Sequence, residues 1–192
     1  MKNQDMRRLI ADTAARLLAQ DGSQDYGSAK RKAARQLGAA DSQNLPDNQE
    51  IENALREYQA IFQAEAAPNR LAQLRKVAIE YMERLSDYDP HLTGSVLNGT
   101  AGKHSDINLQ LFTDKEKEIE FLLMKSPEPY RTAERRSNES AGMVYPRFII
   151  DDPRATIDMT VYPVNELRKL KRVHPDGTPR RLRLSAFADS LK

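Results

Sequence analysis

Apolar residues recur at three- and four-residue steps through the first third of the chain, a spacing typical of amphipathic helices. The pattern predicts three helices, over residues 6–18, 28–37 and 48–62. Asp47 or Asn48 is expected to cap the third of them, because a short polar side chain at that position accepts hydrogen bonds from free backbone N–H groups. The beginning of the chain is therefore expected to be a helical bundle.

A break in this pattern follows at Ala66-Ala67-Pro68. We divide the chain here into an N-terminal helical segment, residues 1–66, and a second domain, residues 67–192. A fourth amphipathic helix is predicted over residues 71–85. A helix–turn–helix DNA-binding unit is an alternative interpretation of the first part, although the turn between its first two helices is long.

Polar and apolar residues alternate over residues 106–112, which predicts a strand with one buried face. Two further strands, residues 143–150 and 155–161, are expected to form a hairpin around a turn at residues 151–154. Helical patterns lie before, between and after these strands. The second domain is therefore predicted to have an α+β fold, in which a mixed β-sheet is flanked by helices.

Two further signals concern the ends of elements in the second domain. Thr113 followed by Glu116 has the spacing of a capping box and predicts a helix that carries Ile119. A last helix is expected to begin near Val164. The chain from His174 onward is expected to be an irregular, basic C-terminal tail, because proline and glycine follow one another closely there.

Composition limits the classes of protein to be considered. The 192 residues are 39% hydrophobic and 30% charged, and they include no cysteine. The absence of cysteine excludes disulfides, thiolate nucleophiles and thiolate-bound metals. No apolar stretch approaches the roughly 20 residues of a membrane-spanning helix, and charged residues interrupt the N-terminal apolar run that a secretory signal needs. We expect a cytoplasmic protein with no membrane partner.

The net charge of +2 is unevenly distributed. Cationic residues gather near the C-terminus: Arg168, Lys169, Lys171, Arg172, Arg180, Arg181 and Arg183. Such a cluster favours contact with phosphates, which makes RNA a candidate partner. A solvated basic helix and tail explains the same residues equally well.

The residue types suited to chemistry are concentrated in one part of the second domain. Gly94 and Ser95 stand at an expected strand-to-helix turn, where backbone N–H groups and a hydroxyl can approach a phosphate. Asp106 follows at the start of the next strand, and Asp158 lies on a later strand with the same alternation. Two carboxylates on neighbouring strands can converge on one metal ion.

These residues resemble the signature of the polymerase-β-like nucleotidyltransferase superfamily. That signature is a hydrophobic-Gly-Ser turn, a short gap, a strand with Asp-hydrophobic-Asp, and a third Asp on a later strand. Gly94-Ser95, Ser105-Asp106-Ile107 and Asp158 match it in order and spacing, within residues 69–165. The resemblance implies Mg²⁺-dependent transfer of a nucleoside monophosphate from a nucleoside triphosphate to a hydroxyl of RNA, a protein or a small molecule. An unrelated α+β domain with simple glycine turns is the alternative.

On this resemblance, Asp106 and Asp158 would be the catalytic residues and would bind Mg²⁺ together with Asn108. The family has a carboxylate where this chain has Asn108. An amide oxygen can ligate a metal ion but brings no charge, so metal binding is weakened. The second interpretation is a catalytically silent nucleotidyltransferase fold that binds a nucleotide or RNA. Asp151 and Asp152 are expected to be turn residues rather than a replacement carboxylate.

The same resemblance assigns the nucleotide phosphates to Gly94, Ser95 and Lys103, with ATP or another nucleoside triphosphate as the ligand. Lys103 and His104 are also explained as solvated loop residues. Tyr130 and the arginines after it suit a base and its phosphates, or form the exposed face of a strand. A third interpretation is a plain interaction protein whose helical segment mediates dimerisation.

Overall fold

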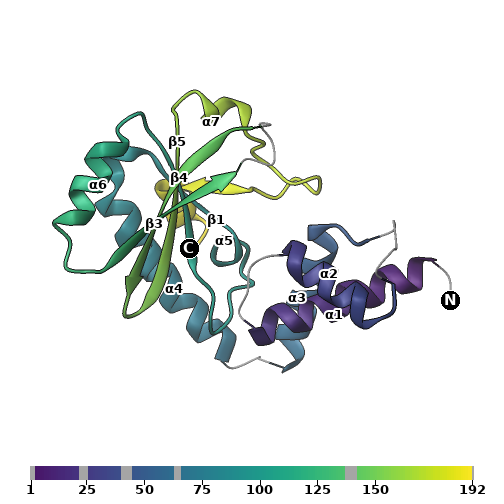
Figure 1. Cartoon of the computed structure of the whole chain (residues 1–192). Coiled ribbons are helices and arrows are strands. Elements are labelled where there is room, and N and C mark those ends of the chain that lie inside the picture. The colour runs from purple at the N-terminus through teal and green to yellow at the C-terminus, as the bar shows by residue number, and fades with distance from the viewer. Residues whose placement is uncertain (1–2, 22–25, 40–44, 63–65, 137–141, 192) are drawn as a thin grey trace. The chain divides into compact units, whose positions relative to one another are not determined.

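The chain divides into two units, each with its own internal contacts. The computed structural model, shown in Figure 1, describes residues 3–21, 26–39, 45–62, 66–136 and 142–191. The first unit comprises Met1–Leu71 with Thr100–Ser105, and the second comprises Ala72–Gly99 with Asp106–Lys192. The stretch predicted as a break, residues 66–68, instead begins helix α4 (Ala66–Arg84), and the division between the units falls a few residues later, within that helix.

In the described part of the first unit, α1 (Asn3–Asp21), α2 (Tyr26–Gln36) and α3 (Asn48–Phe62) precede the start of α4, and these three helices confirm the prediction from apolar spacing. Asp47 caps α3, because its Oδ1 accepts a hydrogen bond from Glu50 N at 2.9 Å. Glu50 Oε2 in turn accepts one from Asp47 N at 2.7 Å, which completes a capping box. The buried residues are small or aliphatic: Ile10, Ala11, Ala14, Ala15, Leu17, Leu18, Ala29, Ala33, Ala34, Ile51 and Leu55.

The second unit is built on a mixed β-sheet with the strand order β3-β4-β5-β2-β1-β6. The strands are β1 (Pro90–Thr93), β2 (Ile107–Phe112), β3 (Tyr130–Arg136), β4 (Val144–Asp152), β5 (Ala155–Tyr162) and β6 (Arg181–Arg183). β2 and β5 are parallel, and the other neighbouring pairs are antiparallel. The predicted α+β class is therefore confirmed.

Helices lie on both sides of this sheet. Figure 1 shows α4 and α6 (Glu116–Met124) on one side and α7 (Glu166–Lys169) on the other. On the α4 side, Tyr81 Oη donates a hydrogen bond to Asp152 Oδ2 at 3.1 Å. On the α7 side, a small cluster is formed by Phe112, Tyr145, Tyr162 and Leu170. The α7 side also carries the polar residues Asn108, Arg147 and Asp158. We call it the polar face of the sheet.

The β4–β5 hairpin is confirmed, but its turn is tighter than predicted. Antiparallel pairing continues until Asp152 lies opposite Ala155, so that only Pro153 and Arg154 form the turn. The prediction that Asp151 and Asp152 are turn residues is wrong, because both belong to β4. The side chain of Asp152 is only 4% exposed and pairs with Arg154. This ion pair joins the end of β4 to the turn.

The capping box predicted at Thr113 and Glu116 is wrong. Thr113 N donates a hydrogen bond to Tyr162 O at 2.9 Å, which continues the pairing of the chain with β5 beyond the end of β2. Thr113 Oγ1 accepts a hydrogen bond from Lys115 N instead. Helix α6 therefore begins only at Glu116.

The chain after His174 is not irregular to its end. It forms strand β6 and then helix α8 (Leu184–Asp189). Strand β6 adds to the sheet beside β1, with Leu182 opposite Leu92. Among the described residues, no helix combines the length and the apolar character that crossing a membrane requires.

Candidate functional site

A tight turn joins β1 to the short helix α5 (Ser95–Asn98). Gly94 occupies this turn with φ +75°, a left-handed conformation that costs glycine little. A β-carbon added to Gly94 would lie 3.3 Å from Asn108 Nδ2. Glycine is thus required both by the backbone conformation and by the close approach of Asn108, which brings the turn against β2.

Ser95 carries a buried hydroxyl. The residue is 7% exposed, and its Oγ has no hydrogen-bond partner in the part of the chain that the structure describes. A buried polar group without a partner costs about 1–3 kcal/mol. A ligand atom that reaches this hydroxyl would remove that cost, so Ser95 has the property expected of a contact residue at the position predicted to bind phosphate.

Asn108 and Asp158 lie side by side on the sheet. The parallel register of β2 and β5 pairs Asn108 with Asp158, and the antiparallel register of β1 and β2 pairs Thr93 with Asn108. Paired residues on neighbouring strands point to the same face, with strands about 4.8 Å apart. This face is the polar face, because Phe112 follows Asn108 on β2 by an even number of residues and belongs to the cluster there.

An ion pair engages both carboxylate oxygens of Asp158. Arg147 Nε donates to Asp158 Oδ1 at 2.6 Å, and Arg147 Nη2 donates to Asp158 Oδ2. The side chain of Asp158 is 8% exposed and that of Arg147 is 34% exposed. Hydrogen bonding to the carboxylate raises the pKa of the Arg147 guanidinium above its ordinary value. A two-pronged pair of this kind combines charge with fixed geometry.

Asp106 stands just before β2 and is half-buried. Its burial and the nearby charge of Asp158 raise the pKa of Asp106 above its ordinary value. The charges of Arg147 and Arg131 and a hydrogen bond with Thr156 act in the opposite direction. Two carboxylates and two guanidiniums therefore influence one another on the polar face.

As arranged, these residues do not fit a site for two Mg²⁺ ions. Mg²⁺ is held in proteins mainly by carboxylates and phosphates together with water, but both oxygens of Asp158 are bound to Arg147 and Asn108 has no charge. No group of three or more His, Cys, Asp or Glu side chains suited to a metal ion occurs among the described residues. The charge of Arg147 also acts on Asp106, so it repels a cation from both carboxylates of the matched motif.

Lys103 belongs to a different unit from Gly94 and Ser95. The segment Thr100–Ser105 is grouped with the helices of the first unit. Gln59 Nε2, on α3, donates a buried hydrogen bond to Thr100 O at 2.9 Å. The structure therefore does not group Lys103 with the predicted phosphate-binding turn.

The C-terminal basic cluster is partly turned inward. Arg181 is 8% exposed, and its guanidinium lies 5.3 Å from the centre of the Phe112 ring. Its N–H groups donate at 3.0–3.1 Å to three backbone carbonyl oxygens, those of Leu167, Leu170 and Lys171. Arg181 therefore holds the segment around α7 to the sheet.

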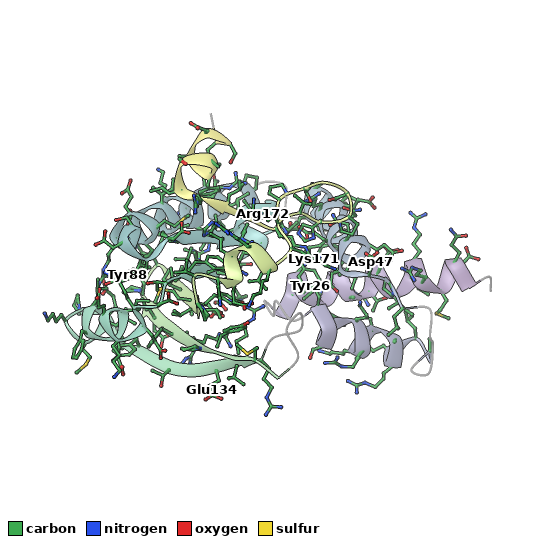
Figure 2. All side chains as sticks on the ribbon, turned by 90° about the horizontal axis from the view of Figure 1, so that it is seen from above. Tyr26, Asp47, Tyr88, Glu134, Lys171 and Arg172 are labelled. Carbon is green, nitrogen blue, oxygen red and sulfur yellow. The ribbon has the colours of Figure 1, made fainter. Side chains whose placement is uncertain are left out.

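Other cations of the cluster differ in their surroundings. Arg183 Nη2 donates to Asp89 Oδ2 at 3.0 Å, and Arg183 Nε donates to His91 Nε2 at 3.3 Å. Lys171 and Arg172 are exposed on the segment that follows α7, as Figure 2 shows. The predicted phosphate-binding cluster is therefore not one continuous exposed surface.

The sequence analysis does not identify Arg147, although this residue binds both carboxylate oxygens of Asp158. One signal is present, because a single charge interrupts the otherwise uncharged residues 144–150. A charged side chain within a strand of this kind needs a partner. The identity of the partner depends on the register of β4 against β5, which a local pattern does not contain.

Neither a protein-family model nor a curated protein matches the chain. The likeness to nucleotidyltransferases therefore depends on a few residues: Gly94, Ser95, Asp106 and Asp158. Their surroundings in the fold are the basis for the proposals that follow.

Proposed function

We propose that this chain is a catalytically silent nucleotidyltransferase-like protein that binds a nucleoside triphosphate on the polar face of its sheet. The observation that carries the proposal is that Arg147 donates hydrogen bonds to both carboxylate oxygens of Asp158. With the neutral Asn108 beside it, the carboxylates that two catalytic Mg²⁺ ions would need are not free. A site of this kind suits binding better than transfer.

Several features support a phosphate-bearing ligand. Ser95 has a buried hydroxyl without a partner among the described residues, at a turn where glycine allows close approach to the backbone. Arg147 and Arg131 offset the charges of the two carboxylates, so the face does not repel an anion. Arginine N–H groups bind phosphate oxygens well. ATP or another nucleoside triphosphate is the proposed ligand class. We also propose that the protein is cytoplasmic.

A nucleotide is favoured over RNA because of the way the basic cluster is used. RNA binding requires several cations on one exposed surface that follow a phosphate backbone. Arg181 is buried against backbone carbonyls, and Arg183 is paired with Asp89. Fewer cations are left for a long polyanion than the sequence indicates, whereas a single triphosphate needs only a small site.

A second candidate function is active nucleotidyl transfer. The observation in its favour is that Asp106 and Asp158 lie close enough for the charge of Asp158 to raise the pKa of Asp106. A pair of neighbouring carboxylates is the minimum that metal-assisted transfer needs. The binding and transfer experiments below separate the two functions.

Calorimetric titration with non-hydrolysable triphosphates of the common ribonucleosides tests the proposed binding. We expect saturable binding of at least one of them. Ser95→Ala is expected to weaken it about tenfold, since it removes a hydrogen bond to a charged ligand, without lowering the melting temperature. Ser185→Ala, at an exposed position on α8, is the matched control and leaves affinity unchanged. Failure of every nucleotide to bind would contradict the proposal.

A transfer assay with α-labelled nucleotide completes the test. The silent fold is expected to transfer no label to RNA, to protein or to itself in the presence of Mg²⁺. Label transfer that Asp106→Ala and Asp158→Ala each abolish, without loss of folding, would establish the enzyme instead.

A further inference from the structure

The charges on the polar face are compensated without a metal ion. Asp106 and Asp158 contribute two carboxylates, Arg147 and Arg131 contribute two guanidiniums, and Asn108 is neutral. A carboxylate that is 8% exposed, as Asp158 is, is stable only with a close positive partner and satisfied hydrogen bonds. Arg147 supplies both at once.

The two arginines are not equivalent in this respect. Arg147 binds Asp158 through two N–H groups. The side chain of Arg131 is 62% exposed, and it forms an ion pair with the exposed Asp151 at 3.9 Å. Exposed pairs of that kind contribute little. Neutralisation of the buried carboxylate therefore depends on Arg147.

We propose that Arg147 is a built-in counter-ion that neutralises Asp158 in place of a divalent cation, and that ligand binding at this face is independent of Mg²⁺. The first part stands on the geometry of the ion pair alone. The second part rests on the proposed nucleotide binding.

Asn108 fits this arrangement. The register places it directly beside Asp158, where like charges on paired strand positions destabilise a sheet. An aspartate at this position would add a third negative charge to a face on which two carboxylates are balanced by two guanidiniums. The neutral amide at 108 and the arginine at 147 are therefore two parts of one charge balance.

Arg147 and a divalent cation exclude one another at Asp158. A metal ion bound to Asp158 would have to displace the guanidinium from at least one oxygen, and the two positive charges would then lie within a few ångströms. Removal of Arg147 leaves two neighbouring carboxylates without their main counter-charge. That arrangement attracts cations, so the loss of Arg147 should create a cation response that the natural chain lacks.

Thermal unfolding of the full chain with and without millimolar Mn²⁺ tests the proposal. Mn²⁺ is the probe because its coordination resembles that of Mg²⁺ and because its paramagnetism allows direct detection. The natural chain should show no Mn²⁺-dependent rise in melting temperature. Arg147→Met, which keeps the apolar stem, should melt lower without metal and regain about 2–4 °C or more with Mn²⁺. Arg136→Met, at an exposed position at the end of β3, is the matched control and should behave like the natural chain.

Two double variants assign the response to this face. Adding Asn108→Asp to Arg147→Met should enlarge the Mn²⁺-induced rise, since a third carboxylate joins the pair. Adding Asp158→Asn to Arg147→Met should abolish it. A response in Arg147→Met that is unchanged in both double variants would overturn the proposal, because the cation would then bind elsewhere.

The natural chain gives a second test that does not depend on the folding of Arg147→Met. Paramagnetic relaxation in a Mn²⁺ titration reports bound metal directly. Equal Mn²⁺ binding by the natural chain and by Asp158→Asn is the expected result, because Asp158 is already occupied by Arg147. Stronger binding by the natural chain, lost in Asp158→Asn, would overturn the proposal.

Nucleotide titrations separate this inference from the proposed function. Equal nucleotide affinity with Mg²⁺ and with a chelator supports the whole inference, and affinity that requires Mg²⁺ overturns its second part. If no nucleotide binds, the proposed function fails, while the Mn²⁺ measurements still decide the role of Arg147.

Discussion

Asp152 and Asp158 stand six residues apart on a hairpin, and each is buried and bound by an arginine. Their surroundings nevertheless differ. Asp152 receives a hydrogen bond from Tyr81 on α4, whereas Asp158 lies on the polar face beside Asn108. At the scale of the residue, the same side chain is an anchor for a helix in one place and part of a candidate site in the other.

The anchoring role of Asp152 predicts a pH-dependent contribution to stability. Hydrogen bonds from Arg154 hold the pKa of Asp152 below its ordinary value. The contribution is therefore present above the pKa of the unfolded chain, about 3.9, and is lost as the pH falls through the lower pKa of the folded chain. Asp152→Asn should lower the free energy of unfolding by about 1–3 kcal/mol at pH 7, measured by urea denaturation.

The difference between Asp152→Asn and the natural chain should shrink as the pH falls below about 4. Asp151→Asn is the control, because Asp151 is the exposed neighbour in the same strand. An equal loss of stability in both variants, or a loss that is independent of pH, would contradict the anchoring role.

At the scale of the element, strand β6 shows why a basic sequence is not always a binding surface. Two residues of the basic cluster, Arg181 and Arg183, lie in this strand, which pairs with β1 at the edge of the sheet. The side chain of Arg181 spans from the strand to the carbonyl groups around α7. The apolar Leu170 of that segment is thereby held against the aromatic cluster.

Arg181 is accordingly expected to contribute to stability rather than to ligand binding. Arg181→Met keeps the apolar stem but leaves backbone carbonyls without a donor, which should cost about 1–3 kcal/mol. Arg168→Met, at an exposed position on α7, should change the free energy of unfolding by less than about 0.5 kcal/mol. Chemical denaturation of both variants provides the measurement. Unchanged stability in Arg181→Met would mean that water replaces the guanidinium without loss.

At the scale of the whole molecule, the charge balance argues against a nucleic-acid-binding protein. The net charge is only +2, and several of the C-terminal cations are engaged within the fold. Nonspecific affinity for nucleic acid depends on the number of phosphates that free cations neutralise. Of the described cluster residues, Arg181 is buried and Arg183 is paired with Asp89, so fewer phosphates can be neutralised than the sequence indicates.

We therefore expect single-stranded RNA to bind no more tightly than about 10⁻⁴ M at physiological salt. Fluorescence anisotropy of a labelled RNA over a series of salt concentrations measures this affinity and its salt dependence. Micromolar binding with a steep salt dependence, weakened by neutralising Lys171 and Arg172 together, would show that the cluster is an RNA-binding surface after all.

How far the sequence predicts this molecule depends on the distance over which each feature is determined. The helices of the first unit and the cap of α3 by Asp47 involve residues close together in the chain, and the sequence predicted the helices and offered Asp47 as one of two cap residues. The box at Thr113 failed although its residues are equally close, because Thr113 N pairs with Tyr162 O from a distant strand. Long-range pairing overrides a local signal there.

The sequence by itself determined the α+β class, the Gly94-Ser95 turn, the strand with Asn108 and the strand with Asp158, since periodicity and glycine act locally. Only the tertiary structure decided the partners of the charges: Arg147 for Asp158, Arg154 and Tyr81 for Asp152, and backbone carbonyls for Arg181. The physical reason is that strand register and side-chain reach bring together residues that no local pattern connects. The electrostatic character of the candidate site depends on those pairings.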